Sequence, residues 1–201
     1  MTYETEKEKM KPIMRNYHDE NDYWRIRQFL REVMILNSLR ELSWSVMRMD
    51  YWRFFGMNDI HPFEILPKII FLWELPDGQI VAVLNPEEQG NAFLQIHPAF
   101  KTRELEEEMI KTAEESLAVV HHDKKKLTLW ADSQDAQRQE LLTAQGFAKN
   151  GWNENQWRRD LEAPLPGIPV PEGYTIRSLG DETELPARSW AHTTSLPFRD
   201  R

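Results

Sequence analysis

The sequence predicts an α/β fold in which a mixed β-sheet carries helices on both faces. The apolar runs 69–73 and 79–84 flank Leu75-Pro76-Asp77-Gly78, a turn in which proline presets φ and glycine accepts a positive φ. These runs therefore form an antiparallel hairpin. A third apolar run, 92–96, is followed by an amphipathic helix and then by a fourth run, 127–130. A crossover helix of that length joins parallel strands, so the sheet is mixed.

One strand and two helices are expected before the hairpin. A short strand at 12–17 precedes a helix at about 22–36, in which apolar residues recur at helical spacing. A second helical stretch, 38–55, is rich in aromatic residues and ends at Gly56. The first helix has three candidate N-cap residues: Asp19, Asn21 and Asp22.

The helix after the third strand begins near Arg103. A polar connector at 121–126 leads to the fourth strand, and a helix at 135–145 is stopped by Gly146. A final antiparallel pair is expected at 147–149 and 156–161. The helix that begins near Arg103 carries one apolar stripe: Leu105, Met109, Ala113, Leu117 and Val120, with Ile110 beside it.

Composition limits the class of protein. The 201 residues are 40% hydrophobic, which suffices for one good core, or for one domain and part of another. A net charge of -8 argues against a nucleic-acid surface, and no apolar run has the length of a membrane span. No cysteine is present, so thiolate catalysis is excluded, and residues 1–11 lack the apolar core of a signal peptide. We therefore expect a cytoplasmic protein that binds neither nucleic acid nor membrane.

The domain organisation changes after residue 161. We expect one domain at 1–163 and a stiff linker at 164–173, which is rich in proline and glycine. Residues 174–182 then repeat the pattern of 14–20: apolar, Arg, polar, apolar or aromatic, spacer, Asp, Glu. The match is short, so either chance or duplication explains it. With duplication, residues 174–201 are the first strand and helix of an incomplete second domain.

A strand, a tight turn and a helix follow one another at 92–119. This order points the free N–H groups of a helix N-terminus toward an anionic ligand. The turn has no glycine, however, and acidic residues fill 104–108, apart from Leu105. Acids in a first helical turn also have a structural explanation, since each stabilises the helix by about 0.3–1 kcal/mol.

The order of these elements resembles the GNAT superfamily of acyl-CoA-dependent N-acetyltransferases between Pro12 and Leu161. The resemblance is carried by the Pro-Asp-Gly hairpin, by the run 93–98 with the helix behind it, and by 127–132 through 141–147, which closes on Gly146-Phe147. The linker and the repeated pattern after it resemble a tandem-GNAT protein.

The resemblance implies an acyl-CoA N-acyltransferase fold in which the mixed sheet is splayed at its centre, where acetyl-CoA binds. The central strand pairs with the pantetheine arm, which implicates Leu94, Gln95 and Ile96. An unidentified amine, on a small molecule or a peptide, then attacks the thioester directly. The turn that wraps the pyrophosphate corresponds to six residues: Lys101, Thr102, Arg103, Glu104, Leu105 and Glu106.

The chain departs from the family pattern at four positions. Glu104 and Glu106 replace glycines that let the backbone approach phosphates, and a close carboxylate adds repulsion of roughly 1–4 kcal/mol. Leu142 stands where a proton-donating Tyr is common, and Asp135 stands where many members carry Asn. The binding turn is therefore degenerate.

Two residues are candidates for the general base. His97 ends the central strand and is either a base or a strand-end polar group, and Glu74 is either a base or an exposed hairpin carboxylate. His121 and His122 fit a solvated connector better than a metal site. An aromatic cluster either lines the acceptor side of the site or packs in the core: Trp44, Tyr51, Trp52, Phe54 and Phe55.

Two functions of different classes remain open. The first is a GNAT-type N-acetyltransferase that uses acetyl-CoA without a covalent enzyme intermediate. The second is a catalytically degenerate GNAT-fold domain that binds a ligand weakly or supports a second, catalytic domain. The sequence does not fix the oligomeric state and is compatible with a homodimer.

Overall fold

The computed structural model describes residues 11–40, 42–56, 65–157, 159–160, 162–164 and 167–195. The chain divides into two compact units, residues 1–156 and residues 157–201. We call them unit 1 and unit 2 and describe each by itself.

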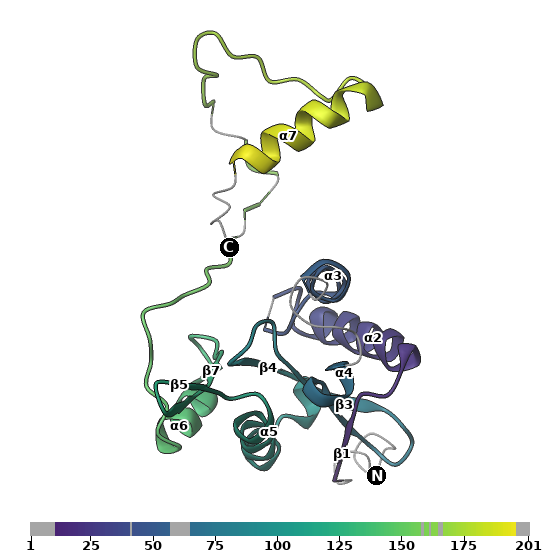
Figure 1. The fold of residues 1–201 in the computed structure, drawn as a ribbon, viewed down its shortest axis with the longest axis vertical. Coiled ribbons are helices and arrows are strands. Elements are labelled where there is room, and N and C mark those ends of the chain that lie inside the picture. Colours follow the sequence, from purple (N-terminus) through teal and green to yellow (C-terminus); the bar gives the residue numbers. More distant parts are fainter. Residues whose placement is uncertain are drawn as a thin grey trace. The chain divides into compact units, whose positions relative to one another are not determined.

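The sheet of unit 1 has the strand order β1-β2-β3-β4-β7. Its strands are β1 (Ile13–Asn16), β2 (Phe71–Glu74), β3 (Ile80–Asn85), β4 (Asn91–Ile96) and β7 (Thr128–Leu129). The first four are antiparallel neighbours, whereas β4 and β7 are parallel. The predicted hairpin, the crossover and the mixed sheet are therefore confirmed (Figure 1).

Helices cover both faces of the sheet, as predicted (Figure 1). One face carries α2 (Glu20–Leu36) and α3 (Val46–Tyr51). The opposite face carries α5 (Arg103–Ser116), and α6 (Ala136–Ala144) packs into the same core. Helix α6 stops just before Gly146, as predicted. Gly146 has a φ of 89°, a left-handed conformation that glycine adopts without strain.

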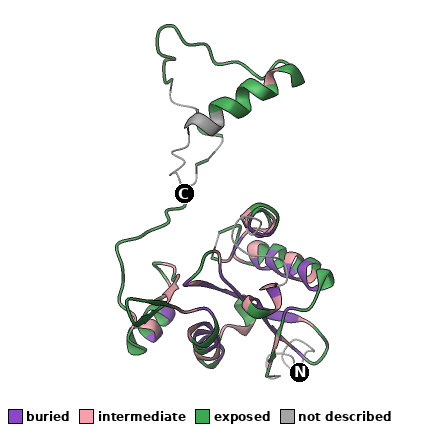
Figure 2. Ribbon diagram, in the orientation of Figure 1, coloured by how far each residue is buried: buried purple, intermediate pink, exposed green. Residues whose placement is uncertain are grey.

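Alternation along the strands separates two cores. Phe93 of β4 packs with residues of α2, whereas Leu94 and Ile96 pack with residues of α5. The buried residues in Figure 2 follow the strands and the inner faces of the helices, whereas unit 2 is almost entirely exposed. Residue parity along β4 therefore decides which helix layer a side chain faces.

A network of ion pairs joins β1, β2 and the start of α2. Arg15 donates to both oxygens of Asp22 at 2.6 Å and to both oxygens of Glu74 at 2.8 and 2.7 Å. Arg25 also bridges the two carboxylates, at 2.9 and 2.6 Å. Burial raises the pKa of each carboxyl group, but the hydrogen bonds from arginine outweigh it, so the pKa of Asp22 and the pKa of Glu74 are both lowered. Of the candidate caps, Asp19 is the N-cap residue of α2.

The predicted helix at 38–55 is wrong in its first part. Ser38 and Leu39 have φ values of 54° and 59°, a left-handed conformation that ends the preceding helix and cannot continue a new one. Helix α3 begins only at Val46, capped by Ser45, and a π-helical turn, η1 (Trp52–Gly56), follows it. A short helix that the sequence did not predict, α4 (Leu66–Ile69), precedes β2.

The expected connector at 121–126 is a second hairpin. It comprises β5 (Val119–His121) and β6 (Lys124–Lys126), with His122 and Asp123 at positive φ in the turn. Val120 lies on this hairpin with 71% of its surface exposed, so its assignment to the apolar stripe of α5 is wrong. The reason is that α5 ends at Ser116, before Val120. The other residues of the stripe are buried, as predicted.

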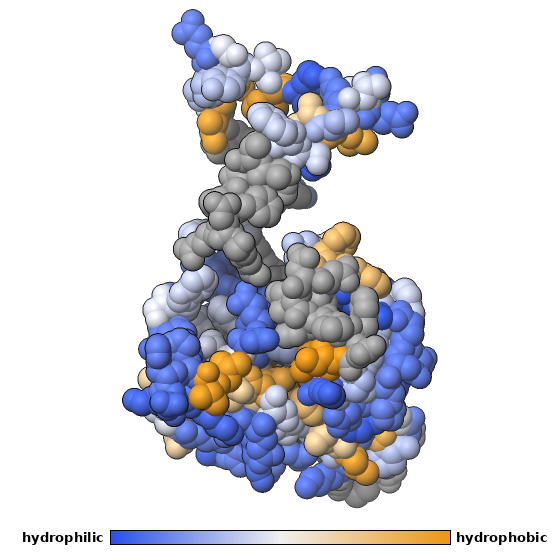
Figure 3. Space-filling view, viewed as in Figure 1, coloured by the Kyte–Doolittle hydropathy of each residue, from blue (hydrophilic) through white to orange (hydrophobic). Residues whose placement is uncertain are grey.

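The expected strand pair at 147–149 and 156–161 is absent from the described residues, which omit 158 and 161. Trp157 is 91% exposed, so it contributes no core contact. In unit 2, a 3-10 turn, η4 (Glu182–Glu184), precedes α7 (Leu185–Ser195), and residues 174–180 form no strand. Apolar residues lie on the surface of unit 2 (Figure 3).

We predict that Arg15→Met destabilises unit 1 by about 3 kcal/mol, because Asp22 keeps its burial and loses its main partner. Urea denaturation followed by circular dichroism measures the change. The matched control is Arg103→Met, which breaks the exposed pair with Glu107 and should cost no more than about 1 kcal/mol. Equal losses in the two variants would contradict the role given to the network.

The same network predicts acid sensitivity. Asp22 and Glu74 bind protons more weakly in the folded protein than in the unfolded chain. Their contribution to stability is therefore complete above about pH 5 and is lost progressively as the pH falls below about 4, toward the lowered pKa values of the folded protein. We expect the urea midpoint to decrease over that window, and the decrease to be smaller in the double variant Asp22→Asn/Glu74→Gln. An unchanged pH profile in that variant would show that other groups cause the decrease.

Candidate functional site

Strands β4 and β7 pair only briefly. Their ladder contains the pairs Asn91↔Thr128 and Ala92↔Leu129, whereas β4 pairs with β3 from Phe93 to Ile96. From residue 93 onward, the β7-side edge of β4 has no strand partner in the described part of the chain. The splayed centre that the resemblance implied is therefore present in the sheet.

Hydrogen bonds at the two ends of β4 show which residues face the open edge. Gly90 O accepts from Thr128 N at 2.8 Å on the β7 side, and His97 N donates to Val81 O at 2.9 Å on the β3 side. Backbone groups of an antiparallel strand alternate between its edges. Leu94 and Ile96 share the parity of Gly90, so their N–H and C=O groups point to the open edge.

Gln95 has the opposite parity, so its backbone faces β3. Its side chain is buried, and its Oε1 accepts from Trp44 N at 2.7 Å while its Nε2 donates to Asn85 Oδ1 at 3.3 Å. Gln95 therefore fixes the segment before α3 to the sheet. Of the three residues expected to present backbone groups to a ligand, the geometry favours Leu94 and Ile96.

Aromatic rings gather where β4 and β7 part. Phe93 stacks on Trp130 with ring centroids 5.6 Å apart and packs against Trp44 at 5.1 Å. The guanidinium of Arg48 lies 4.9 Å from the Phe93 centroid and pairs with Glu87 and Glu154. The Nε1 atoms of Trp44 and Trp130 are buried, and neither has a hydrogen-bond partner among the described residues. Two buried indole N–H donors on rings that pack against Phe93 thus lack an acceptor among the described residues.

The turn before α5 is a helix cap whose basic residues are already paired. Thr102 is the N-cap residue, and its Oγ1 accepts from Leu105 N at 3.2 Å. Lys101 pairs with Asp135 at the start of α6, and Arg103 pairs with Glu107 at 2.8 Å. A phosphate group at this turn would have to compete with those carboxylates.

Two acids of this turn differ sharply in environment. Glu104 is exposed, whereas Glu106 is completely buried and accepts from Arg138 Nε at 2.6 Å. Its charge is therefore balanced inside the protein, which offsets the repulsion expected between Glu106 and a bound phosphate. The second oxygen, Oε2, is buried without a hydrogen-bond partner among the described residues.

Asp135 ties the two helix N-termini together. It caps α6 by accepting from Arg138 N at 3.2 Å and also accepts from Lys101 Nζ. Burial raises its pKa, but the bonds from Lys101 and from the Arg138 backbone have the larger combined effect, so the pKa of Asp135 is lowered. Asp135 is thus an ionised structural residue.

His97 caps the short turn that follows β4. Its Nδ1 accepts from Ala99 N at 3.2 Å, so the neutral ring carries its proton on Nε2. Nε2 lies 3.6 Å from Glu32 Oε1, beyond hydrogen-bond distance. The side chain is largely buried and faces the α2 layer, as its parity with Phe93 requires. Its role as a base stays a prediction.

Glu74 is held by the two arginines of the β1–β2 network. Its lowered pKa makes it a weaker base than an ordinary carboxylate. The expected exposed hairpin carboxylate is in fact a half-buried member of that network. The geometry therefore favours a structural role for Glu74 over proton abstraction.

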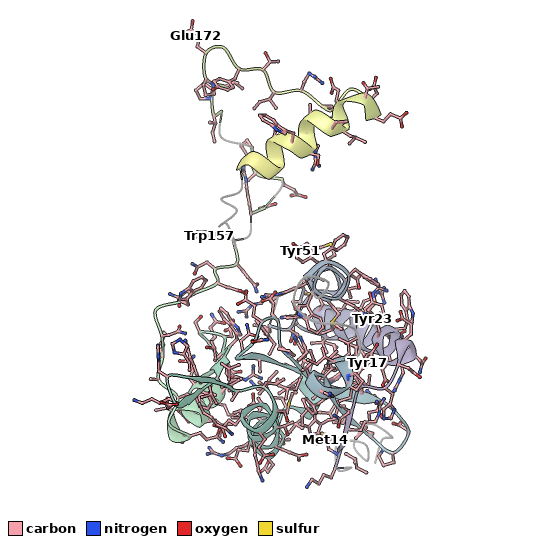
Figure 4. All side chains as sticks on the ribbon, viewed as in Figure 1. Met14, Tyr17, Tyr23, Tyr51, Trp157 and Glu172 are labelled. Atoms are coloured by element: carbon pink, nitrogen blue, oxygen red, sulfur yellow. The ribbon has the colours of Figure 1, made fainter. Side chains whose placement is uncertain are left out.

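The aromatic cluster of the second helical stretch is split between core and surface. Trp44 and Trp52 are buried, whereas Tyr51 and Phe55 stack on each other at the surface (Figure 4). Within the described ranges, no group of three or more acidic or histidine side chains is placed to hold a metal ion. No helix there has the length and apolarity that crossing a membrane requires.

Sequence reasoning missed Arg138 and Trp130. A signal for Arg138 exists, because it stands three and four positions before Leu141 and Leu142 on one helical face. An arginine on the apolar face of a short helix indicates a buried partner. For Trp130 the sequence predicts a core strand, and no feature of it indicates that the indole N–H lacks a partner.

Comparison with known proteins gives a remote structural likeness. No protein-family model matches the chain, and no curated protein matches it. A search of solved structures finds a GCN5-related N-acetyltransferase from Sphaerobacter thermophilus, at 16% sequence identity and a TM-score of 0.49. The match covers 92% of this chain and 58% of that chain.

We predict that Arg138→Met destabilises unit 1 by about 3–5 kcal/mol, because it leaves Glu106 charged and buried without its partner. The double variant Glu106→Leu/Arg138→Met should recover most of that loss. Chemical denaturation of the two variants tests the pair. Lys111→Met, which breaks an exposed pair with Glu115, is the control. A double variant as unstable as the single one would contradict the uncompensated charge.

Proposed function

We propose that unit 1 is an acetyl-CoA-dependent N-acetyltransferase domain of the GNAT type. The observation that carries the proposal is the free edge of β4, where Leu94 and Ile96 direct backbone groups away from β3. An acyl-pantetheine arm contains amides that can pair with such an edge as a further strand would. The order of strands and helices agrees with the expectation drawn from the sequence.

The residues at the parting of β4 and β7 fit such a ligand. The N–H groups of Trp44 and Trp130 are buried donors that lack acceptors among the described residues, and amide or thioester oxygens are acceptors. Burying a donor without an acceptor costs about 1–3 kcal/mol, and a bound carbonyl oxygen would remove that cost. Each indole is therefore a specific candidate for contact with acetyl-CoA.

The phosphates would lie at the turn that precedes α5. Thr102 and the first N–H groups of α5 provide the helix N-terminus, and Lys101 and Arg103 provide positive charge. To bind phosphate oxygens, Lys101 must break its ion pair with Asp135, and Arg103 must break its ion pair with Glu107. We therefore propose weaker phosphate binding than a glycine-rich turn would give.

Acetyl-CoA would supply a thioester carbonyl carbon to an amine acceptor. The amine nitrogen forms a bond to that carbon, the carbon–sulfur bond breaks, and the amine loses a proton while the thiolate gains one. His97 is the candidate base, provided that one ring nitrogen is freed from its present partner. Leu142 cannot protonate the thiolate, so that proton would come from solvent or from the acceptor.

A second function is favoured by one observation. The buried Glu106–Arg138 pair fills the first turn of α5, and the cations Lys101 and Arg103 are satisfied within the protein. A domain that had lost the cofactor would have this arrangement. Unit 1 would then be a non-catalytic support for another domain, and cofactor binding separates the two functions.

We predict that acetyl-CoA raises the thermal stability of the full chain. At about a hundred times its dissociation constant, a ligand of the native state adds about 2.7 kcal/mol. Differential scanning fluorimetry and titration calorimetry measure the effect. The double variant Lys101→Ala/Arg103→Ala should weaken binding at least about tenfold, since two phosphate contacts are lost.

The matched control is Lys111→Ala/Lys124→Ala, which removes the same charge from exposed positions away from this turn. Binding should remain unchanged in the control. No stabilisation of the parent chain at millimolar acetyl-CoA would reject the acetyltransferase in favour of the non-catalytic support. Binding that survives the loss of Lys101 and Arg103 would place the phosphates elsewhere.

A further inference from the structure

The ion pair at the start of α2 occurs a second time in the chain. Arg15 bonds both oxygens of Asp22, and Arg177 bonds both oxygens of Glu184 at 2.8 and 2.6 Å. Both members of the pair are displaced by 162 positions, from 15 to 177 and from 22 to 184. In each case, the arginine also donates to the carbonyl of the next residue, at 2.8 and 3.0 Å.

The cap residue between the arginine and the helix also has the same backbone conformation in both places. Asp19, the N-cap of α2, has φ and ψ of -152° and -172°, and Asp181, the N-cap of η4, has -155° and -173°. Each cap carboxylate accepts from the N–H two residues later, at 2.9 and 2.8 Å. The paired acid accepts from the N–H four residues before it, at 2.9 Å from His18 and 2.7 Å from Gly180.

We call residues 12–23 the first junction and residues 174–185 the second junction. The two share only Arg, Asp and Glu at equivalent positions, yet they form the same set of hydrogen bonds and the same cap. A short coincidence of sequence would not reproduce side-chain bonds to backbone groups at several separate positions. The agreement favours duplication over chance as the origin of the repeated pattern.

The junctions differ in what covers them. Tyr17 and Tyr23 of the first junction are buried, as Figure 4 and their 4% and 1% exposed surface show. Their counterparts in the second junction, Leu179 and Leu185, are 47% and 48% exposed. The two apolar positions that are buried in unit 1 are therefore accessible in unit 2.

The arginines differ in the same way. Arg15 contacts a second carboxylate, Glu74, which β2 supplies from the residue opposite Ile13. Among the described residues, Glu184 is the one carboxylate that Arg177 contacts, and the Arg177 side chain is 62% exposed. A further carboxylate, presented as Glu74 is, would complete the network of the second junction.

We infer that the second junction is a duplicate of the first and forms a docking surface for an antiparallel strand of the β2 type. The occupant is the edge of a second sheet of the same kind, with a carboxylate two residues beyond the position opposite Arg177. Residues 174–178 would pair with that strand as β1 pairs with β2, and Leu179 and Leu185 would be buried. This inference does not depend on whether unit 1 binds acetyl-CoA.

A transplant within unit 1 tests the inference, because unit 1 contains a strand of the β2 type. Residues 12–23 of the full chain are replaced by residues 174–185. A second version keeps Tyr17 and Tyr23 and takes the remaining residues from the second junction, so that loss of two aromatic core residues does not decide the result. The control inserts residues 173–184 instead and likewise keeps Tyr17 and Tyr23, so that the arginine moves by one position and to the opposite face of the strand while the two core residues stay.

The expected result is cooperative thermal unfolding of the second version, and none in the shifted control. Glu74→Gln should lower the unfolding midpoint by at least about 4 °C in the parent and in the transplant alike, because the imported arginine takes the place of Arg15. A transplant that unfolds no more cooperatively than the shifted control would overturn the inference. A folded transplant that is insensitive to Glu74→Gln would also overturn it.

A measurement on the unmodified chain tests the junction directly. The Gly180 amide donates to Glu184, so its NMR resonance should shift upfield in Glu184→Ala and should keep its position in the control Glu172→Ala. No difference between the two variants would mean that the second junction does not form in solution. That outcome overturns the inference whatever the transplant does.

Discussion

Strand β4 pairs with β7 at Asn91 and Ala92, and with β3 on its other edge from Phe93 to Ile96. The rest of unit 1 is arranged around this change. The two side-chain layers of β4 set the two cores, since Phe93 faces α2 and Leu94 faces α5. The open edge is a stretch inside the sheet where backbone groups are left for a ligand, and Trp44 and Trp130, whose rings pack against Phe93, each carry a buried indole N–H without a partner among the described residues. The proposed function follows from this opening.

Each longer helix described begins with a carboxylate that a cation from another segment neutralises. Asp22 lies in the first turn of α2, Glu106 lies in the first turn of α5, and Glu184 lies just before α7. Each of these carboxylates forms an ion pair with an arginine. An acid is stabilised by the positive end of a helix, and the arginine then fixes the helix to its neighbour. At α5 this ion pair lies in the first helical turn, where the proposed cofactor would place a phosphate, so helix anchoring would compete with binding of that cofactor.

The predictable part of the fold rests on residue periodicity. The apolar runs at 69–73, 79–84 and 92–96 correspond to β2, β3 and β4, and the stripe of α5 is buried up to Leu117. Local backbone conformation limited the rest. The sequence contains no glycine or proline at Ser38, His122 or Asp123, so nothing indicated the left-handed residues that break a helix and close a hairpin.

By itself, the sequence determined the mixed sheet, the strand–helix crossover, the helix stop at Gly146 and the repeated Arg-to-acid pattern, because these depend on local periodicity and turn chemistry. Only the tertiary structure decided which backbone groups of β4 are open, and that Lys101 pairs with Asp135 and Glu106 with Arg138. Those facts depend on where α6 and β7 lie against α5 and β4. Side chains more than thirty positions apart in the chain meet there, as the separations of 34 and 32 residues show, and no local pattern encodes such a meeting.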